Sequence, residues 1–487
     1  SATPVITRTA TYIYACAEWI EDAFQGKELL LEIYSRLLNP TSVSLVDTVR
    51  LGYTHRAVAD QNVAVVNITG RSGARTIDGF SNGQIRAYDV TNPSAVQEIV
   101  GPIARTASGY GITLQPGATA RRLLVLTPDR SLEPISITAN RPSSWNARTN
   151  GADVVYITHR DFAGSIAPLK ALRESQGYRV AVVDIEDLYD EFTYGFESPQ
   201  AIRSFVANAR STWSKAPTFV TLVGDGSLDP KNYLGAGDFS FVPGKLIDAS
   251  SIEFASDDWL VDGNGDDLPD VAVGRLPVRS ASEAAALVAK IIAYETTGTV
   301  NKSAMLVTDT SDIWEFTETT AKIRALVPSE YVVEQVNRSV EGDSTARQMI
   351  LTGASAGPGI VNFSGHGSID TWRGNLLTAD DAALLSNSGR LSVYVMGNCL
   401  NGYYQDPNLL CLGEALLKAP NGAIVVWASS GATDSERQQT LISEFYRTLF
   451  SGNPVTLGQA AARAKSAVTG DVRQSWVLLG DSATRLH

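Results

Sequence analysis

The chain has 487 residues, which at roughly 100–200 residues per domain predicts two to four domains. Hydrophobic residues make up 44% and charged residues 19%, an ordinary globular composition that excludes a disordered or fibrous protein. The net charge of −12 argues against nucleic acid or an anionic membrane as a partner. No run reaches the roughly 18 apolar residues that a transmembrane helix needs.

The sequence starts at Ser1 with neither a methionine nor a signal-peptide pattern, so we expect that a segment upstream has been removed. Three cysteines, Cys16, Cys399 and Cys411, leave at least one free thiol, and a bridge between Cys16 and Cys411 is an alternative for the other two. The cysteine and histidine spacings match no zinc site, so we expect no structural zinc and no required cofactor.

Residues 1–150 carry short β-rich runs separated by Gly, Asn, Pro and Ser. The clearest runs are residues 29–34, 63–68 and 85–90, at a spacing typical of sandwich strands. This pattern predicts an N-terminal all-β sandwich over 1–150. It contains no chemical motif, so its role stays open between a pro-domain, a substrate-presenting module and an attachment module.

From residue 152 the pattern changes to apolar strands that alternate with helices, which predicts mostly parallel sheets covered on both faces. We expect two α/β lobes, at 151–300 and 301–487, with a reactive cysteine only in the second. The expected strands are 154–158, 179–184, 219–223, 304–308, 331–336, the runs before His366 and Cys399, and 423–428; the expected helices are 166–176, 199–215, 281–294, 315–326, 344–355, a short one after 378, and 412–418.

Two of these strands end on reactive side chains. One apolar run leads into Ser364-Gly365-His366-Gly367 and the next into Gly397-Asn398-Cys399. Because a parallel sheet collects the carboxyl ends of its strands at one edge, we expect His366 and Cys399 to share one cleft. A random cysteine and histidine would more often be a buried thiol and a core histidine, but the adjoining glycines favour the catalytic interpretation.

A cysteine hydrolase needs a thiolate, a proton source for the leaving nitrogen, and donors for the oxyanion. Cys399 supplies the nucleophile and His366 the acid. The backbone N–H of Gly367, whose residue has no side chain to block approach, and the N–H of Cys399 are the expected oxyanion donors.

The blocks around the histidine and the cysteine resemble those of the gingipain family of cysteine peptidases, peptidase family C25, which is related to caspases and legumain. Further similar blocks follow in the same order over the region from residue 152 to the end. The matching blocks are 157–162, 222–225, 270–277, 363–372, 397–403, 412–417 and 479–481. The resemblance implies an endopeptidase with a two-lobed caspase-like (caspase-hemoglobinase) fold and a dyad of His366 and Cys399.

The resemblance also implies roles for three further residues. Asp309 matches an acidic residue that orients the histidine, although it equally well fits a cap of the following turn. Asp312 resembles the acid that lines the specificity pocket of arginine-selective members, and implies a basic P1 residue, arginine or lysine. Trp372, inside the histidine block, is assigned to substrate binding.

An acidic loop, residues 262–270, is a candidate calcium site. Asp262, Asn264, Asp266 and Asp270 place oxygen side chains at positions one, three, five and nine of a glycine-bearing loop, as hard cations prefer. The glutamate that closes an EF-hand at position twelve is missing, so a solvated acidic turn is the alternative to structural Ca²⁺.

The main functional hypothesis is therefore a secreted or cell-surface bacterial cysteine endopeptidase that acts on proteins or peptides; the localisation rests on the resemblance alone. One alternative is a sortase-like transpeptidase of a bacterial secretion system, which passes the same acyl group to an amine. The other is a non-catalytic binding or scaffold protein. A larger parent chain and secretion-system partners are compatible with all three.

Overall fold

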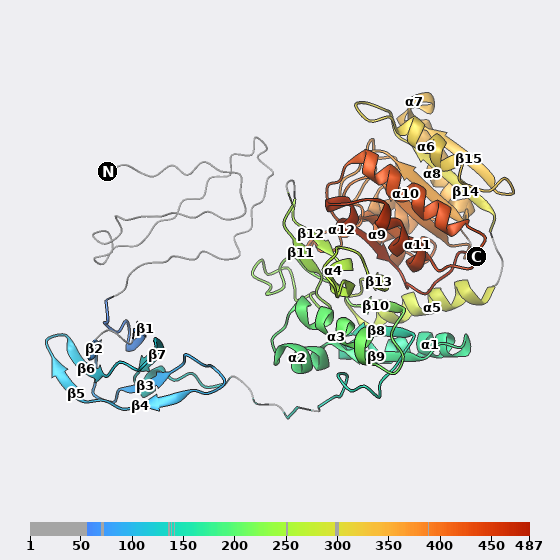
Figure 1. The fold of residues 1–487 in the computed structure, drawn as a ribbon. Coiled ribbons are helices and arrows are strands. Elements are labelled where there is room, and N and C mark those ends of the chain that lie inside the picture. Colours follow the sequence, from blue (N-terminus) through green and yellow to red (C-terminus); the bar gives the residue numbers. More distant parts are fainter. Residues whose placement is uncertain are drawn as a thin grey trace, which may run out of the picture. The chain divides into compact units, whose positions relative to one another are not determined.

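The computed structural model describes residues 56–69, 73–134, 137, 139–140, 142–249, 252–297, 301–387 and 389–487. The strand expected at 29–34 and Cys16 lie outside these residues. The pattern of contacts within the chain separates it into two compact units, with the boundary between Asn140 and Arg141 (Figure 1).

The described part of the N-terminal unit is built from antiparallel strands in two sheets, with orders β1-β7-β3-β4 and β2-β6-β5. The strands are β1 (Val63–Ile68), β2 (Arg75–Phe80), β3 (Arg86–Asp89), β4 (Gln97–Ile99), β5 (Ile103–Thr106), β6 (Gly109–Leu114) and β7 (Arg121–Leu126). Leu123 and Val125 of β7 share one buried core with Ile112 and Leu114 of β6. The two sheets thus contribute to a common core, while a sandwich over the whole of 1–150 stays a prediction.

Residues 141–487 form a ten-stranded sheet with the order β15-β14-β16-β17-β18-β19-β13-β10-β8-β9, so strands of both expected lobes join one sheet. Its strands are β8 (Val154–Thr158), β9 (Val180–Asp184), β10 (Phe219–Val223), β13 (Ala272–Leu276), β14 (Ser303–Thr308), β15 (Val332–Asn337), β16 (Ile360–Ser364), β17 (Ser392–Gly397), β18 (Ala423–Ser429) and β19 (Trp476–Leu479). A separate hairpin pairs β11 (Lys245–Ile247) with β12 (Phe254–Ser256).

The two halves of the large sheet run in opposite directions. β18 pairs with β19 antiparallel, whereas the pairings on either side of this junction are parallel. The carboxyl ends of β16 and β17 therefore face one edge of the sheet, and those of β8 and β10 face the other. The large mixed sheet is mostly parallel, as expected from the sequence.

Helices connect and cover these strands (Figure 1). They are α1 (Arg160–Ser175), α2 (Ile185–Thr193), α3 (Pro199–Thr212), α4 (Asp258–Val261), α5 (Ala281–Thr297), α6 (Phe316–Arg324), α7 (Arg338–Glu341), α8 (Asp343–Ala356), α9 (Leu412–Lys418), α10 (Ser435–Leu449), α11 (Leu457–Ala464) and α12 (Asp471–Ser475), with 3₁₀ turns at Pro128–Arg130, Ala379–Leu384 and Lys465–Ala467. α1 begins six residues before the predicted 166 because the ring of His159 accepts the N–H of Asp161 and caps the helix.

β8 shows why its sequence is apolar at every position. Val154 and Tyr156 lie in a core with residues of α1 and α5, whereas Val155 and Ile157 lie in a second core with residues of α2 and α3. Successive side chains of a strand point to opposite faces, so a strand covered on both faces reads as a continuous apolar run.

Buried polar contacts connect the segment after β19 to the half of the sheet that contains β8 and β10. Asp481, fully buried just after β19, accepts hydrogen bonds from Arg173 of α1, Thr221 of β10 and Tyr156 of β8. Arg173 also pairs with Glu295 of α5. The Leu479-Gly480-Asp481 block therefore joins the carboxyl-terminal segment to the strands of the other half.

Candidate active site

His366 and Cys399 follow adjacent strands at equal distances beyond the last paired residues. β16 and β17 run parallel in a register that pairs Ser364 with Gly397, and each reactive residue lies two positions further on. Adjacent strands are about 4.8 Å apart. The register brings the two residues to the same edge of the sheet, on neighbouring strand ends.

The glycines on both sides of His366 are required by close contacts. A Cβ at Gly365 would lie 2.4 Å from Cβ of Asp309, and one at Gly367 would lie 2.0 Å from Nδ2 of Asn398. The loop after β17 is thus packed directly against the histidine loop. A hydrogen bond of 2.6 Å from Nδ2 of Asn401 to the carbonyl of Ser368 joins the same two loops.

Cys399 is a free, partly exposed cysteine. Its sulfur accepts the backbone N–H of Thr433 over 3.3 Å, just before the N-terminus of α10. Nε2 of Gln438, a buried residue of α10, holds Thr433 through its hydroxyl at 2.5 Å. The sulfur also lies 3.6 Å from the carbonyl of Thr433, so the loop before α10 contacts the nucleophile through its main chain, which sequence patterns did not reveal.

The ring of His366 lies between a carboxylate and an aromatic edge. Its Nε2 lies 2.9 Å from Oδ2 of Asp312, and the ring meets Phe316 edge-on with centroids 5.1 Å apart. Because an ionised carboxylate only accepts hydrogen bonds, Nε2 carries the proton in this pair. In the neutral ring, Nδ1 is then the unprotonated nitrogen.

Asp312, expected to line a specificity pocket, lies beside the histidine ring, and its role in substrate selection stays a prediction. Its carboxylate binds both His366 and Nη1 of Arg373, the latter at 2.8 Å. The backbone N–H of Trp314, with Arg373 and His366 as further contributors, lowers the pKa of this carboxyl to about 2. Asp312 is thus an ionised partner of the histidine ring.

Asp309, expected either to orient the ring or to cap the following turn, accepts the backbone N–H of Thr310 over 2.7 Å and contacts His366 only through the histidine backbone. The carboxylate is fully buried and its Oδ2 accepts the N–H of His366 over 3.1 Å. Arg338 pairs with Oδ1 at 2.9 Å and Nε of Arg373 lies 2.7 Å from Oδ2. Asp309 follows β14 directly and has a short side chain, so its carboxylate reaches only the main chain of the histidine loop. The ring of His366 contacts Asp312 instead.

Trp372 is buried, and the prediction that it binds substrate is wrong for this conformation. Its side chain has no exposed surface and stacks on Phe363 of β16, with ring centroids 4.2 Å apart and planes 8° from parallel. The indole therefore packs on β16 and supports the loop that carries His366.

The acidic loop after α4 is satisfied from within the protein. Asp262 accepts the N–H groups of Gly265, Asp266 and Asp267, and Asp270 accepts that of Gly263. Nδ2 of Asn264 donates to Asp266. Among the described residues no group of three or more His, Cys, Asp or Glu is placed to hold a metal ion. The loop does not fit a ready calcium cage, and calcium binding stays a prediction.

Three further polar residues have structural partners. His159 caps α1, and Cys411 caps α9 by accepting the N–H of Glu414 on its sulfur. Burial raises the pKa of the Cys411 thiol well above its ordinary value. Asp225 lies at the opposite edge of the sheet and pairs with Arg279 over 2.6 Å.

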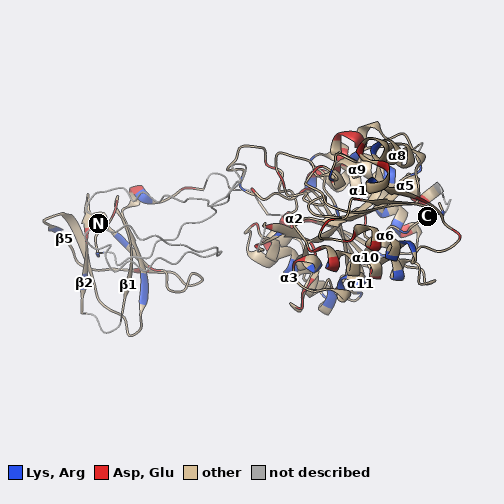
Figure 2. Cartoon of the chain, turned by 90° about the horizontal axis from the view of Figure 1, so that it is seen from above, with Lys and Arg blue, Asp and Glu red and all other residues tan. Residues whose placement is uncertain are grey.

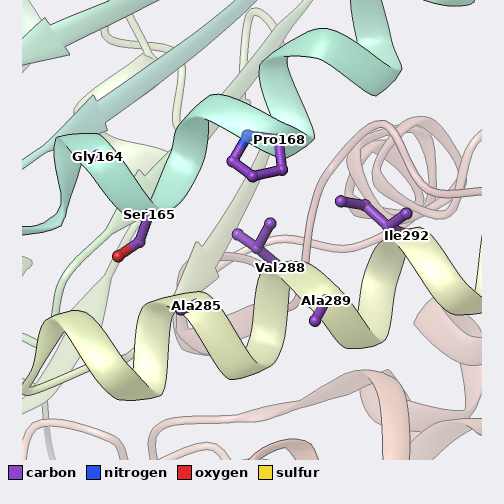
Figure 3. A pocket seen from close by; sticks show the side chains of 7 residues that line it. All are labelled: Gly164, Ser165, Pro168, Ala285, Val288, Ala289 and Ile292. Atoms are coloured by element: carbon purple, nitrogen blue, oxygen red, sulfur yellow. The ribbon is translucent and has the colours of Figure 1, made fainter.

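A cavity of about 380 Å³ lies away from these residues, between α1 and α5 (Figure 3). Pro168 faces Val288 and Ile292 across it, and the remaining lining residues are small.

Figure 2 shows Lys and Arg interspersed with Asp and Glu along the helices of residues 141–487. Across the described residues, no helix is long and apolar enough to cross a membrane.

A family model, "Peptidase family C25", matches residues 147–487, well over half of the sequence. The chain belongs to peptidase family C25. Gingipain R2 of Porphyromonas gingivalis is 22% identical over 306 residues, which cover 60% of this chain but only 38% of that protein.

Solved structures show the same fold in the family. The Arg-specific cysteine proteinase gingipain R superimposes with a TM-score of 0.58 at 20% identity, covering 72% of this chain and 80% of its own. Dimeric latent PorU from Porphyromonas gingivalis superimposes with a TM-score of 0.50 at 15% identity, covering 88% of this chain and 39% of its own. The C25 chain described here therefore has the gingipain fold.

Proposed function

We propose that this C25 chain is a cysteine endopeptidase in which Cys399 is the nucleophile and His366 the general acid and base. The observation that carries the proposal is the register of β16 and β17, which puts both residues two positions beyond the paired Ser364 and Gly397. Membership of a peptidase family and the free, partly exposed thiol of Cys399 support it.

The reaction begins when the Cys399 sulfur attacks the carbonyl carbon of the scissile bond and its proton passes to Nδ1 of His366. The carbon–nitrogen bond then breaks, His366 returns the proton to the leaving amine, and an acyl-enzyme remains. Water, deprotonated by the same nitrogen, attacks the acyl carbon, releases the carboxylic acid and restores the thiol.

The oxyanion formed in each step needs donors. Within the described residues, the backbone N–H groups of Gly367 and Cys399 donate to no other group of the protein. Free N–H groups beside a nucleophile are suited to bind a developing negative charge. We assign the oxyanion contacts to these two groups.

Asp312 keeps the proton of the ring on Nε2 and leaves Nδ1 free for the thiol, so its proposed role is to position His366. Asp312 already binds Trp314, His366 and Arg373, so an arginine or lysine at P1 would have to share this carboxylate with the Arg373 cation. The similarity to an Arg-specific proteinase supports a basic P1 preference, whereas this pairing argues against Asp312 as its cause.

A secreted or cell-surface location is part of the same proposal, because it follows the similarity to gingipain R2. The acyl-enzyme also allows transfer to an amine in place of water. Mass spectrometry of products formed with an added amine nucleophile separates the two: hydrolysed peptide alone supports the peptidase, and an amide product supports the transpeptidase.

A peptide library tests the proposal directly. We expect the purified chain to cleave members of the library and Cys399→Ala to cleave none, while Cys411→Ala, which removes the buried thiol, keeps the cleavage pattern. Cleavage by Cys399→Ala at the wild-type rate would refute the assignment. The library also reports the P1 residue, which decides the basic preference.

A further inference from the structure

Arg373 links the two acidic residues that contact His366, Asp309 and Asp312, and neither composition nor motif spacing pointed to it. Its Nε lies 2.7 Å from Asp309, its Nη1 donates to Asp312 over 2.8 Å, and its Nη2 donates to the carbonyl of Thr310. Its backbone N–H donates to the carbonyl of His366 over 2.8 Å. One side chain thus spans the loop from 309 to 312 and ties it to the histidine loop.

The Asp312 oxygen that binds Arg373 is the one that binds Nε2 of His366. Asp312 is about one third exposed, on a loop whose neighbour Ile313 points into solvent. Without an anchor, water would compete for this carboxylate. Nη1 of Arg373 hydrogen-bonds Asp312 while its Nε lies at ion-pair distance from the buried carboxylate of Asp309, so the guanidinium connects the exposed acid to a buried one.

We propose that Arg373 is a positioning residue that holds the Asp312 carboxylate on Nε2 of His366 and fixes the 309–312 loop beside the histidine. The inference rests on the proposed function of His366. It adds a residue that contacts neither substrate nor sulfur and acts through Asp312.

The charged groups around His366 determine how removal of Arg373 changes the protonation of the histidine ring. Asp312 and Arg373 lie beside the ring, and Phe316 covers it from α6. Buried Asp309, which pairs with Arg338, accepts the backbone N–H of His366. Cys399 follows the neighbouring strand β17. Removing Arg373 frees the Asp312 carboxylate to leave Nε2, so the ring loses the negative charge that favours the imidazolium.

The test compares wild type, Arg373→Met and Arg373→Lys, with Arg347→Met as a matched control. Arg347 is 35% exposed against 33% for Arg373, and it also pairs with a buried aspartate, Asp381, but does not contact His366. The measurements are kcat and KM per alkylator-titrated active site, and the titration of His366 by NMR, where four histidines give few signals to assign.

For Arg373→Met we expect kcat to fall at least roughly tenfold with KM little changed, and the pKa of His366 to fall because Asp312 no longer lies on Nε2. Arg373→Lys keeps the charge but cannot reach both acids, so kcat falls while the His366 pKa moves less. Arg347→Met leaves both unchanged. An Arg373→Met protein with wild-type kcat and His366 pKa overturns the proposal, as does wild-type kcat in Arg373→Lys. If wild type proves inert, the proposed function fails, yet the NMR titration still decides whether Arg373 controls His366.

Discussion

Nε2 of His366 lies 2.9 Å from the carboxylate of Asp312, so the acid that the sequence assigned to a specificity pocket is the partner of the histidine ring. Asp309, assigned to the ring, accepts the backbone N–H of the same histidine. The two acids therefore share one histidine, one through its side chain and the other through its main chain.

The first prediction concerns the ring contact. Asp312→Asn removes the charge beside Nε2, so the pKa of His366 should fall and the acidic limb of kcat/KM should move to lower pH. We expect kcat to drop roughly tenfold to a hundredfold, part of the 10²–10⁴ that general acid–base catalysis typically contributes. The measurement is the pH profile of peptide hydrolysis.

Asp343→Asn is the control for Asp312, since Asp343 is an exposed aspartate that pairs with Arg338 in the same region. It should leave the limb in place. Asp312 itself, with its pKa lowered to about 2, stays ionised above about pH 4 and does not create the acidic limb. An unchanged limb in Asp312→Asn would rule out the ring contact.

The second prediction concerns the glycine after the histidine. Gly367→Ala places a Cβ against Nδ2 of Asn398, so this buried amide must give up its hydrogen bonds to Cys399 and Asn401 or the two loops must separate. We expect a loss of about 1–3 kcal/mol in the free energy of unfolding and a loss of activity. Denaturant titration and peptide hydrolysis measure the two effects.

Gly164→Ala provides the comparison, because a Cβ there meets nothing within 4 Å and the residue lies inside α1. It should stabilise the protein by up to about 1 kcal/mol through helix propensity. Equal effects of the two substitutions would show that the Gly367 contact with Asn398 does not form.

The third prediction is a pH dependence of stability from Lys290. This half-buried side chain donates to the carbonyls of Leu417 and Ala419 at the end of α9, and desolvation lowers its pKa to about 7. Between about pH 7 and 10 the unfolded chain holds the lysine proton more tightly than the folded protein does. Stability therefore rises with pH in this window, by at most about 1.4 kcal/mol per pH unit from this group.

Denaturant titrations from pH 7 to 9 check the effect of Lys290. The slope of stability against pH should be less positive in Lys290→Met than in wild type, whereas Lys170→Met, which removes an exposed lysine paired with Glu174, should keep the wild-type slope. Identical slopes in wild type and Lys290→Met would contradict the lowered pKa.

The strand ends that carry His366 and Cys399 were predictable because each follows an apolar run and lies beside a glycine, a local pattern. β19 was not, since its four residues, Trp476–Leu479, owe their strand to pairing with β18 and β13, which lie earlier in the chain. For a similar reason, the sequence could not show which of Asp309 and Asp312 contacts the histidine ring. Which acid meets the ring depends on Arg373, a side chain some sixty positions away.

The burial and contacts of some side chains also could not be predicted from the local sequence pattern. Trp372 lies in a motif beside the histidine, and only the stacking on Phe363 of β16 shows that it faces the core. The acidic loop at 262–270 has the spacing of a cation loop, but its carboxylates bind backbone N–H groups and arginines. Such contacts depend on the path of the main chain, which residue spacing alone does not define.

Stoichiometric labelling with an irreversible thiol alkylator tests the central claim most directly. The native protein is treated with increasing alkylator, residual peptide hydrolysis is measured, and peptide mapping locates the label. If Cys399 is the nucleophile, activity falls in proportion to the labelling of Cys399, while Cys411, buried and with a raised thiol pKa, stays unmodified. Full modification of Cys399 with peptide hydrolysis retained would contradict it.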